Sequence, residues 1–269
     1  NLCHHEKEQV NLDYLVRMTE TQAFILGLLQ GLTEFIPVSS SGHLELGNYI
    51  LGDVGSEHLT FTLVVHLATV LSTLVVFRKE ISSLVVSTIS LKKNEDTLFV
   101  GKLLFSAVPV FILGLFFREE VESLFTGNLL VVGMCLLVTA SLLLFAHFYK
   151  GKGKKNIGWS DSLIIGLAQA VAVLPGLSRS GATISTGILL GNDRKETARF
   201  SFLMVLLPII GAMMLDIFTL KDSILESIGI IPLTIGFLTA FFSGWLACKW
   251  MINIVSRGKL IYFSLYCLI

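Results

Sequence analysis

The sequence contains the stretch GLLQGLTEFIPVSSSGH at Gly27–His43. A second stretch, GLAQAVAVLPGLSRSG at Gly166–Gly181, repeats its order: an apolar segment with a Gln near its start, then a Pro, then a Ser-rich turn that ends in Gly. With a one-residue gap at each Pro, the aligned positions are Gln30 with Gln169, Pro37 with Pro175, and Ser39–Gly42 with Ser178–Gly181. The first copy carries a Glu and a His, and the second carries an Arg. We therefore expect the two copies to fold together as the acid/base side and the anion-binding side of one active site.

The composition is that of a helical membrane protein. Of the 269 residues, 53% are hydrophobic and only 15% are charged, whereas soluble domains carry roughly 25% charged residues. Several apolar runs approach or exceed the roughly 20 residues that a helix needs to cross a bilayer. The formal net charge is zero, so no nucleic-acid partner is predicted.

Five apolar runs are long enough to span a membrane, and a sixth begins near the end of the sequence. They are Leu59–Phe77, Leu98–Phe117, Leu129–Phe148, Phe200–Leu220, Ile230–Trp250 and the run from Leu260. Each motif region instead holds two shorter apolar runs, broken by Pro, Gly and Ser: Phe24–Ile36 with Leu44–Leu51, and Leu163–Leu174 with Ile184–Leu190. Irregular backbone at membrane depth is tolerated where it lines a protein cavity, so each pair is predicted to be a re-entrant helix-loop-helix.

Lys and Arg residues gather in four loops and are sparse in two. The rich loops are Arg78–Lys93, Lys150–Lys155, Arg194–Arg199 and Lys249–Lys259, and the sparse ones are Arg118–Asn128 and Lys221–Gly229. The positive-inside rule makes the first four cytoplasmic and the other two external. Each repeat is then one re-entrant pair plus three spans, and this odd number turns the second repeat upside down. The predicted fold is an all-α integral membrane protein with an inverted-topology repeat, about six transmembrane helices and two re-entrant pairs.

The domain organisation follows from this pattern. Residues 1–17 are predicted to be an N-terminal extension or interfacial tail, because they are polar and lack the apolar region of a signal peptide. Residues 18–269 are predicted to be a single membrane domain, with repeat one at about residues 22–148 and repeat two at about 161–269. Broken helices of an inverted repeat meet near the membrane midplane, so we expect the site at the repeat interface.

Gln30 and Glu34 are four residues apart and so share one helix face. A carboxylate inside a membrane segment is costly and marks a functional site by default. Glu34 is therefore predicted to bind a metal ion or to act as acid/base, with Gln30 lending an amide oxygen to a hard cation such as Mg²⁺ or Ca²⁺. In the alternative interpretation, Glu34 is a buried acid satisfied by helix-end amides.

Ser39, Ser40 and Ser41 precede a half-helix that begins near His43. A serine caps a helix well, but capping explains only one of the three hydroxyls. A helix N-terminus is also an anion site, with free amides and the positive end of the dipole. His43 is a candidate general base or nucleophile, against the alternative of a structural histidine.

The second copy opens a half-helix with Ser178, Arg179 and Ser180, and Thr183 follows. An Arg at membrane depth needs an anionic partner, and its planar fork suits phosphate oxygens. The alternative is an Arg179–Glu34 salt bridge that only locks the repeats together. His66 lies inside a span and is interpreted as a hydrogen-bonded core residue. Hydroxyls, a His, an acid and an Arg at two helix N-termini favour a phosphate ester or anhydride as ligand, and a site with apolar walls favours one with a lipid tail.

These motifs resemble those of undecaprenyl-diphosphatases of the bacitracin-resistance type. The resemblance rests on QGLTEFIPVSSSGH at Gln30–His43 and PGLSRSGAT at Pro175–Thr183, with supporting similarity in Val64–Arg78 and Ala198–Ala212. It covers essentially everything from Met18 onward. One departure is Gln30, which stands where many family members have Glu, so that the ligand set of a metal ion loses one carboxylate.

The resemblance implies a bacterial inner-membrane enzyme that hydrolyses undecaprenyl diphosphate to undecaprenyl phosphate and inorganic phosphate. That reaction recycles the lipid carrier for cell-wall synthesis and confers bacitracin resistance. The resemblance also implies a divalent cation, Mg²⁺ or Ca²⁺, and an active site open to the outer face. The implied metal residues are Gln30 and Glu34, the catalytic residues Glu34, Ser40, His43 and Arg179, and the substrate-binding residues Ser39, Ser41, Ser178, Ser180 and Thr183.

The attacking group is left open by the motif. We favour attack by Ser40 with His43 as its base, because a serine nucleophile is commonly activated by an adjacent histidine. The alternatives are attack by His43 itself or by water. The expected partners are a polyprenyl diphosphate lipid and the bilayer, and a homodimer is left open. A transporter or flippase for a phosphorylated lipid is the alternative function, because inverted repeats with broken helices are typical of transporters.

Overall fold

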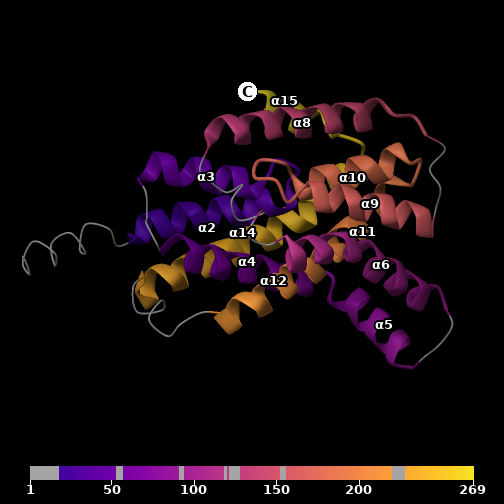
Figure 1. Cartoon of the computed structure of the whole chain (residues 1–269), viewed down its shortest axis with the longest axis horizontal. Coiled ribbons are helices and arrows are strands. Elements are labelled where there is room, and N and C mark those ends of the chain that lie inside the picture. Colours follow the sequence, from indigo (N-terminus) through magenta and orange to yellow (C-terminus); the bar gives the residue numbers. More distant parts are fainter. Residues whose placement is uncertain are drawn as a thin grey trace, which may run out of the picture.

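The computed structural model describes residues 18–52, 57–90, 94–117, 120, 128–151, 156–219 and 228–269. In these residues the regular structure is helical and no β-strand occurs (Figure 1). The predicted tail at residues 1–17 lies outside the described residues. The prediction of an all-helical protein is confirmed for the described part of the chain.

Twelve helices are described. They are α2 (Glu20–Phe35), α3 (Ser40–Leu51), α4 (Glu57–Val76), α5 (Arg78–Ile89), α6 (Glu95–Phe116), α8 (Leu129–Phe148), α9 (Trp159–Val171), α10 (Arg179–Leu189), α11 (Arg194–Met204), α12 (Leu206–Thr219), α14 (Ile230–Ser256) and α15 (Ile261–Leu268).

Four helical segments of the described residues are long and apolar enough to cross a membrane: Glu95–Phe116, Leu129–Phe148, Arg194–Met214 and Ile230–Ser256. A fifth is obtained if the bent pair Thr60–Val76 and Arg78–Ile89 counts as one span. The protein is therefore a multi-pass membrane protein. The predicted sixth span is only α15, whose 8 residues rise roughly 12 Å, less than the thickness of a bilayer.

Two predicted elements differ in detail from the structure. The loop expected after residue 77 is instead the helix α5, which turns away from α4 by 79°. The span expected at Phe200–Leu220 is divided into α11 and α12 at Val205. Pro208 explains this division, because its nitrogen has no hydrogen to donate to the carbonyl of Met204.

The first motif forms a helical hairpin whose two helices are separated by a short turn. α2 begins with a capping box between Thr19 and Gln22 and ends at Phe35, two residues before Pro37. α3 then begins after Ser39, which has a φ of 69° and is the only described non-glycine residue with positive φ. Such a conformation is uncommon for a residue with a side chain, so the turn is tightly determined by its surroundings.

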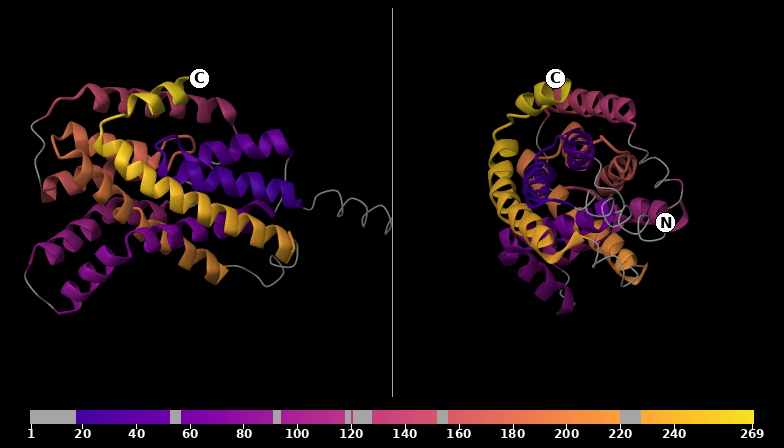
Figure 2. Two further views of the ribbon diagram at one scale, coloured as in Figure 1. Left: turned by 180° about the vertical axis from the view of Figure 1, so that it is seen from behind. Right: turned by 90° about the vertical axis from the view of Figure 1, so that its left-hand side faces the viewer.

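The second motif forms a matching hairpin from α9 and α10. Its turn contains Gly176 with a φ of 88°, a left-handed conformation that favours glycine. The two hairpins approach from opposite ends of the molecule, α2 and α3 from the left and α9 and α10 from the right in Figure 1, and the reverse view in Figure 2 agrees. Their turns touch in the middle, where a Cβ added at Gly42 would lie 3.2 Å from Cα of Gly176.

Small residues allow the first helix of each hairpin to pack closely on a long helix of the other half of the chain. α2 packs on α14, where a Cβ added at Gly27 would lie 2.6 Å from the carbonyl oxygen of Gly236. α9 packs on α6, where a Cβ at Gly166 would overlap the carbonyl oxygen of Ser106. Such close contact of small residues is the usual basis of helix association in membranes. Each hairpin is therefore held by the opposite half.

We expect Gly31→Ala to destabilise the protein, because the new Cβ would overlap Ser243 Oγ and lie 2.5 Å from the carbonyl oxygen of Ala240. Overpacking of this kind costs about 1–3 kcal/mol. Gly114→Ala is the matched control, because no atom lies within 4 Å of a Cβ at that helical position. Thermal unfolding in detergent measures both, and an equal melting temperature for Gly31→Ala and Gly114→Ala would contradict the prediction.

Candidate active site

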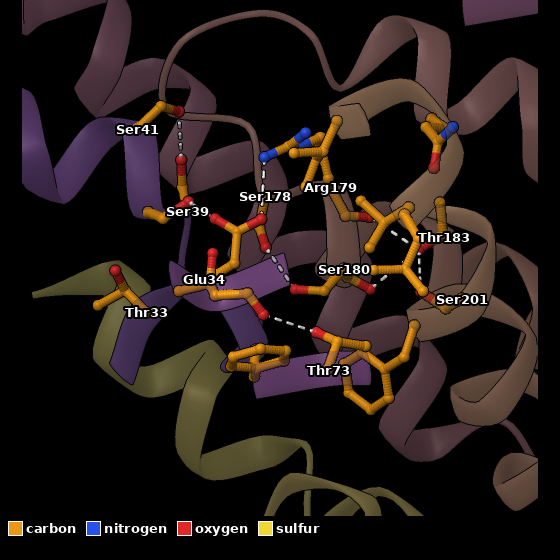
Figure 3. A pocket seen from close by; sticks show the side chains of 18 of the residues that line it. Thr33, Glu34, Ser39, Ser41, Thr73, Ser178, Arg179, Ser180, Thr183 and Ser201 are labelled. Carbon is orange, nitrogen blue, oxygen red and sulfur yellow. Dashed lines mark hydrogen bonds and ion pairs between the residues drawn. The ribbon is translucent and has the colours of Figure 1, made fainter. Parts of the chain in front are cut away.

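Glu34 is the centre of a buried polar cluster at the meeting point of the two hairpins. Its side chain is only 6% exposed. Oε1 accepts a hydrogen bond from Arg179 Nη2 at 3.0 Å, and Figure 3 shows the two side chains facing each other. Oε2 accepts one from Ser40 Oγ at 2.5 Å and one from Gln30 Nε2 at 3.0 Å. The first motif thus supplies an acid with its serine and glutamine, and the second motif supplies the cation.

The Ser-rich turns cap the two half-helices in the same way. Ser39 Oγ accepts from the amide of Gly42 at 3.3 Å and lies 3.3 Å from the hydroxyl of Ser41. Ser178 Oγ accepts from the amide of Gly181 at 3.0 Å and lies 3.3 Å from the hydroxyl of Ser180. Both helix N-termini therefore face the cluster with their hydroxyls, an arrangement suited to anions.

A small cavity lies between these groups. Its enclosed volume is about 30 Å³, on the order of one or two water molecules. Its polar lining comprises Thr33, Glu34, Ser39, Ser40, Ser41, Thr69, Thr73, Gln169, Ser178, Arg179, Ser180, Thr183 and Ser201.

Thr183 is in the cavity wall but its hydroxyl is engaged. Oγ1 donates to the carbonyl of Arg179 at 2.8 Å and lies 2.5 Å from the hydroxyl of Ser201 on α11. This side chain therefore holds the first turn of α10 in place against α11. Thr183 supports Arg179 in this structure, in addition to the ligand contact expected from the sequence.

His43 has different neighbours from those expected. Its Nδ1 lies 2.7 Å from the carbonyl oxygen of Ser39, and its Nε2 lies 2.9 Å from the hydroxyl of Tyr266 on α15. The rings of His43 and Tyr266 are stacked, with centroids 5.6 Å apart. Ser40 is thus hydrogen-bonded to Glu34, and the two ring nitrogens of His43 lie close to Ser39 and Tyr266 and not to Ser40, with which a pairing was expected.

His66 belongs to the cluster, although the sequence interpretation placed it in the core. Its Nδ1 lies 2.8 Å from the carbonyl oxygen of Thr62, and its Nε2 lies 3.8 Å from Glu34 Oε2. Thr69 and Thr73, further along α4, line the cavity. The only feature of the sequence that indicated this placement was the helical spacing of His66, Thr69 and Thr73 inside an apolar span.

The donor set for a divalent cation is sparse. Among the described residues, no group of three or more His, Cys, Asp and Glu side chains is placed to hold a metal ion. Glu34 is the one carboxylate of the cavity wall, and the buried Oε1 of Gln30 has no hydrogen-bonding partner. Gln30 itself does not belong to the cavity lining. One carboxylate therefore fits Mg²⁺ or Ca²⁺ only if phosphate oxygens and water supply most of the shell, as is common for Mg²⁺, and if Gln30 turns its amide oxygen toward the ion.

Comparison with known proteins shows the family to which the chain belongs. The sequence is 53% identical to an undecaprenyl-diphosphatase of Bacteroides fragilis over 92% of this chain and 94% of that protein. It is 51% identical to an undecaprenyl-diphosphatase of Bacteroides thetaiotaomicron, over 94% of this chain and 96% of that protein. It is 38% identical to one of Oceanobacillus iheyensis, over 91% of this chain and 92% of that protein. The sequence model of one family, described as bacitracin resistance protein BacA, matches residues 23–269. A match of this extent, across both hairpins and the cluster around Glu34, shows that the chain belongs to the BacA family of bacitracin resistance proteins.

Proposed function

We propose that this protein hydrolyses undecaprenyl diphosphate to undecaprenyl phosphate and inorganic phosphate. The reaction would recycle the lipid carrier of cell-wall synthesis and confer resistance to bacitracin. The proposal is supported by the names of the relatives and by the family. The observation that carries it is the cluster itself, in which Ser40 is hydrogen-bonded to Glu34 and Glu34 to Arg179 between two helix N-termini.

Binding of the diphosphate is proposed to open the Glu34–Arg179 ion pair. The guanidinium of Arg179 would turn to the phosphate oxygens, for which its planar fork is well suited. The N-termini of α3 and α10 and the hydroxyls of Ser39, Ser41, Ser178 and Ser180 would stabilise the remaining negative charge. This exchange of partners releases Glu34 Oε1 at the moment when a base is needed.

Ser40 is the proposed nucleophile and Glu34 its base. Ser40 Oγ already donates its proton toward Glu34 Oε2 at 2.5 Å, so the proton can pass to the carboxylate as Oγ attacks the terminal phosphorus. The bond to the bridging oxygen breaks, and Glu34 passes its proton to the undecaprenyl phosphate as this group leaves. The Glu34 carboxylate then accepts a proton from a water molecule that attacks the phosphoserine, and it returns this proton to Ser40 Oγ as phosphate is released. His66, whose Nε2 lies 3.8 Å from Glu34 Oε2, is proposed to position this pair, and His43 is proposed to hold the turn through the carbonyl of Ser39.

A divalent cation remains part of the proposal. Glu34 and the free amide oxygen of Gln30 would hold it together with oxygens of the substrate. The ion would supply charge neutralisation for the phosphoryl group.

The finer topology is also proposed: an inverted repeat in which the two hairpins are re-entrant and the active site opens to the outer face of the bacterial inner membrane. The opposed hairpins and the distribution of Lys and Arg between the loops support it. The apolar helices around the cluster would then face the polyprenyl tail within the bilayer.

The alternative of a lipid transporter or flippase draws on the same broken helices. A carrier needs a cation such as Arg179 to bind its anion, but it has no need of a hydroxyl hydrogen-bonded to a carboxylate. The Ser40–Glu34 contact therefore favours the enzyme.

Replacing Ser40 with Ala should lower the rate of phosphate release at least about 100-fold, because the nucleophile is removed. The assay is phosphate release from undecaprenyl diphosphate in detergent. Ser141→Ala is the control, because Ser141 is exposed on α8 and its hydroxyl only donates to the carbonyl of Leu137. Near-normal turnover by Ser40→Ala would point to water or His43 as the attacking group.

Glu34→Gln should abolish turnover and yet strengthen anion binding about tenfold in the presence of EDTA. In the wild type, Arg179 must leave a carboxylate before it can bind a phosphate, and the neutral amide removes that competition. Binding of a methylene-bridged farnesyl diphosphate analogue, measured by calorimetry, tests this. Weaker binding by the variant without metal would contradict the proposed exchange of partners.

Removal of divalent cations with EDTA should abolish phosphate release by the wild type, and Mg²⁺ or Ca²⁺ should restore it. Gln30→Leu should require a higher metal concentration for half-maximal activity, because one oxygen ligand is lost. Full activity in EDTA, or an unchanged metal requirement in Gln30→Leu, would remove the metal from the proposal.

A further inference from the structure

Gln169 is a buried amide with no partner. It lies on α9 with 0% of its surface exposed, and among the described residues neither Oε1 nor Nε2 has a hydrogen-bonding partner. The residue lines the same cavity as Glu34 and Arg179. Burying an amide without hydrogen bonds destabilises a fold, so an amide in this state at a ligand cavity is expected to have its partner in the ligand.

The repeat explains why this amide is free. Gln169 aligns with Gln30, and both are 0% exposed. Four residues after Gln30 comes Glu34, whose Oε2 accepts a hydrogen bond from Gln30 Nε2 at 3.0 Å. Four residues after Gln169 comes Val173, which offers no polar side chain. The glutamine at this helix position thus donates to a carboxylate in the first repeat, and the aligned glutamine of the second repeat has no such acceptor four residues later.

The neighbours of the cavity indicate which ligand this amide would bind. The nearby hydroxyls of Thr183 and Ser201 are paired with each other at 2.5 Å. The positive groups on this side are Arg179 and the N-terminus of α10, which favour an anion. A primary amide offers two N–H donors without adding charge. Its Nε2 can therefore donate to an oxygen that Arg179 neutralises.

We propose that Gln169 is a substrate-binding residue whose Nε2 donates to a non-bridging oxygen of the diphosphate. This proposal rests on the proposed function, because it names a ligand contact of the same site. In this proposal the second repeat supplies a neutral hydrogen-bond donor, Gln169, to the cavity that Arg179 also lines. In the first repeat, the corresponding Gln30 donates a hydrogen bond to Glu34.

The variant Gln169→Leu tests whether Gln169 contacts the ligand or has only a structural role. Leu has nearly the volume of Gln and needs no hydrogen bonds, so the unliganded variant should melt at the wild-type temperature or above it. Its KM should rise at least tenfold. The rise in melting temperature on adding the methylene-bridged farnesyl diphosphate analogue should largely disappear. In Gln169→Glu the carboxylate would repel the phosphate, and the loss should be greater still.

Thr197→Val is the matched control. Thr197 is 1% exposed and its Oγ1 also has no partner, but it lies on α11 and does not belong to the cavity lining given above. This variant should keep the wild-type KM and the wild-type response to the analogue.

Two results would overturn the proposal. One is an unchanged KM and an unchanged response to the analogue in both Gln169 variants. The other is a lower melting temperature of unliganded Gln169→Leu with the response to the analogue retained, because it would indicate a structural role such as holding a buried water. Absence of phosphate release by the wild type would count against the proposed enzyme alone, and the response to the analogue would still decide the role of Gln169.

Discussion

The buried ion pair between Glu34 and Arg179 joins the two halves of this protein. Each charge would be costly at membrane depth by itself, and each has the other as its partner at 3.0 Å. A buried pair contributes little net stability, but removal of one member costs about 3–5 kcal/mol because a charge is left uncompensated. The hairpins must therefore meet with their turns in register. In the proposed mechanism, the same requirement would keep the cation that binds phosphate beside the base until the substrate separates them.

This meeting of the hairpins depends on backbone contact. Gly42 lies against Gly176 between the turns, and the first helix of each hairpin packs on a long helix of the opposite half through Gly or Ser. Larger residues would hold the helices apart and widen the distance from Glu34 to Arg179. Catalytic geometry and membrane packing are thus set by the same small residues, since positions near an active site must hold to within a fraction of an ångström.

Part of the site could be predicted because its residues lie in two short motifs. Gln30, Glu34 and Ser40 lie within ten residues of each other, so a local helix and the turn after it are enough to bring the three side chains close together. Arg179 could be joined to them only through the internal repeat. His66 and Gln169 could not be assigned in this way. The position of His66 beside Glu34 depends on how α4 packs against α2. The role proposed for Gln169 depends on whether any neighbouring helix brings a hydrogen-bonding partner to its amide.

The sequence by itself determined that the chain is a helical membrane protein whose two broken motifs contain an acid, a histidine and an arginine. Composition, apolar run length and the positions of Pro, Gly and Ser are local properties, and they suffice for those conclusions. Only the tertiary structure decided that His43 pairs with Tyr266 and that His66 lies beside Glu34. It also decided that α4 bends by 79° into α5. Hydrogen-bond partners depend on which helix faces pack together across distant parts of the chain, and helical periodicity does not specify that choice.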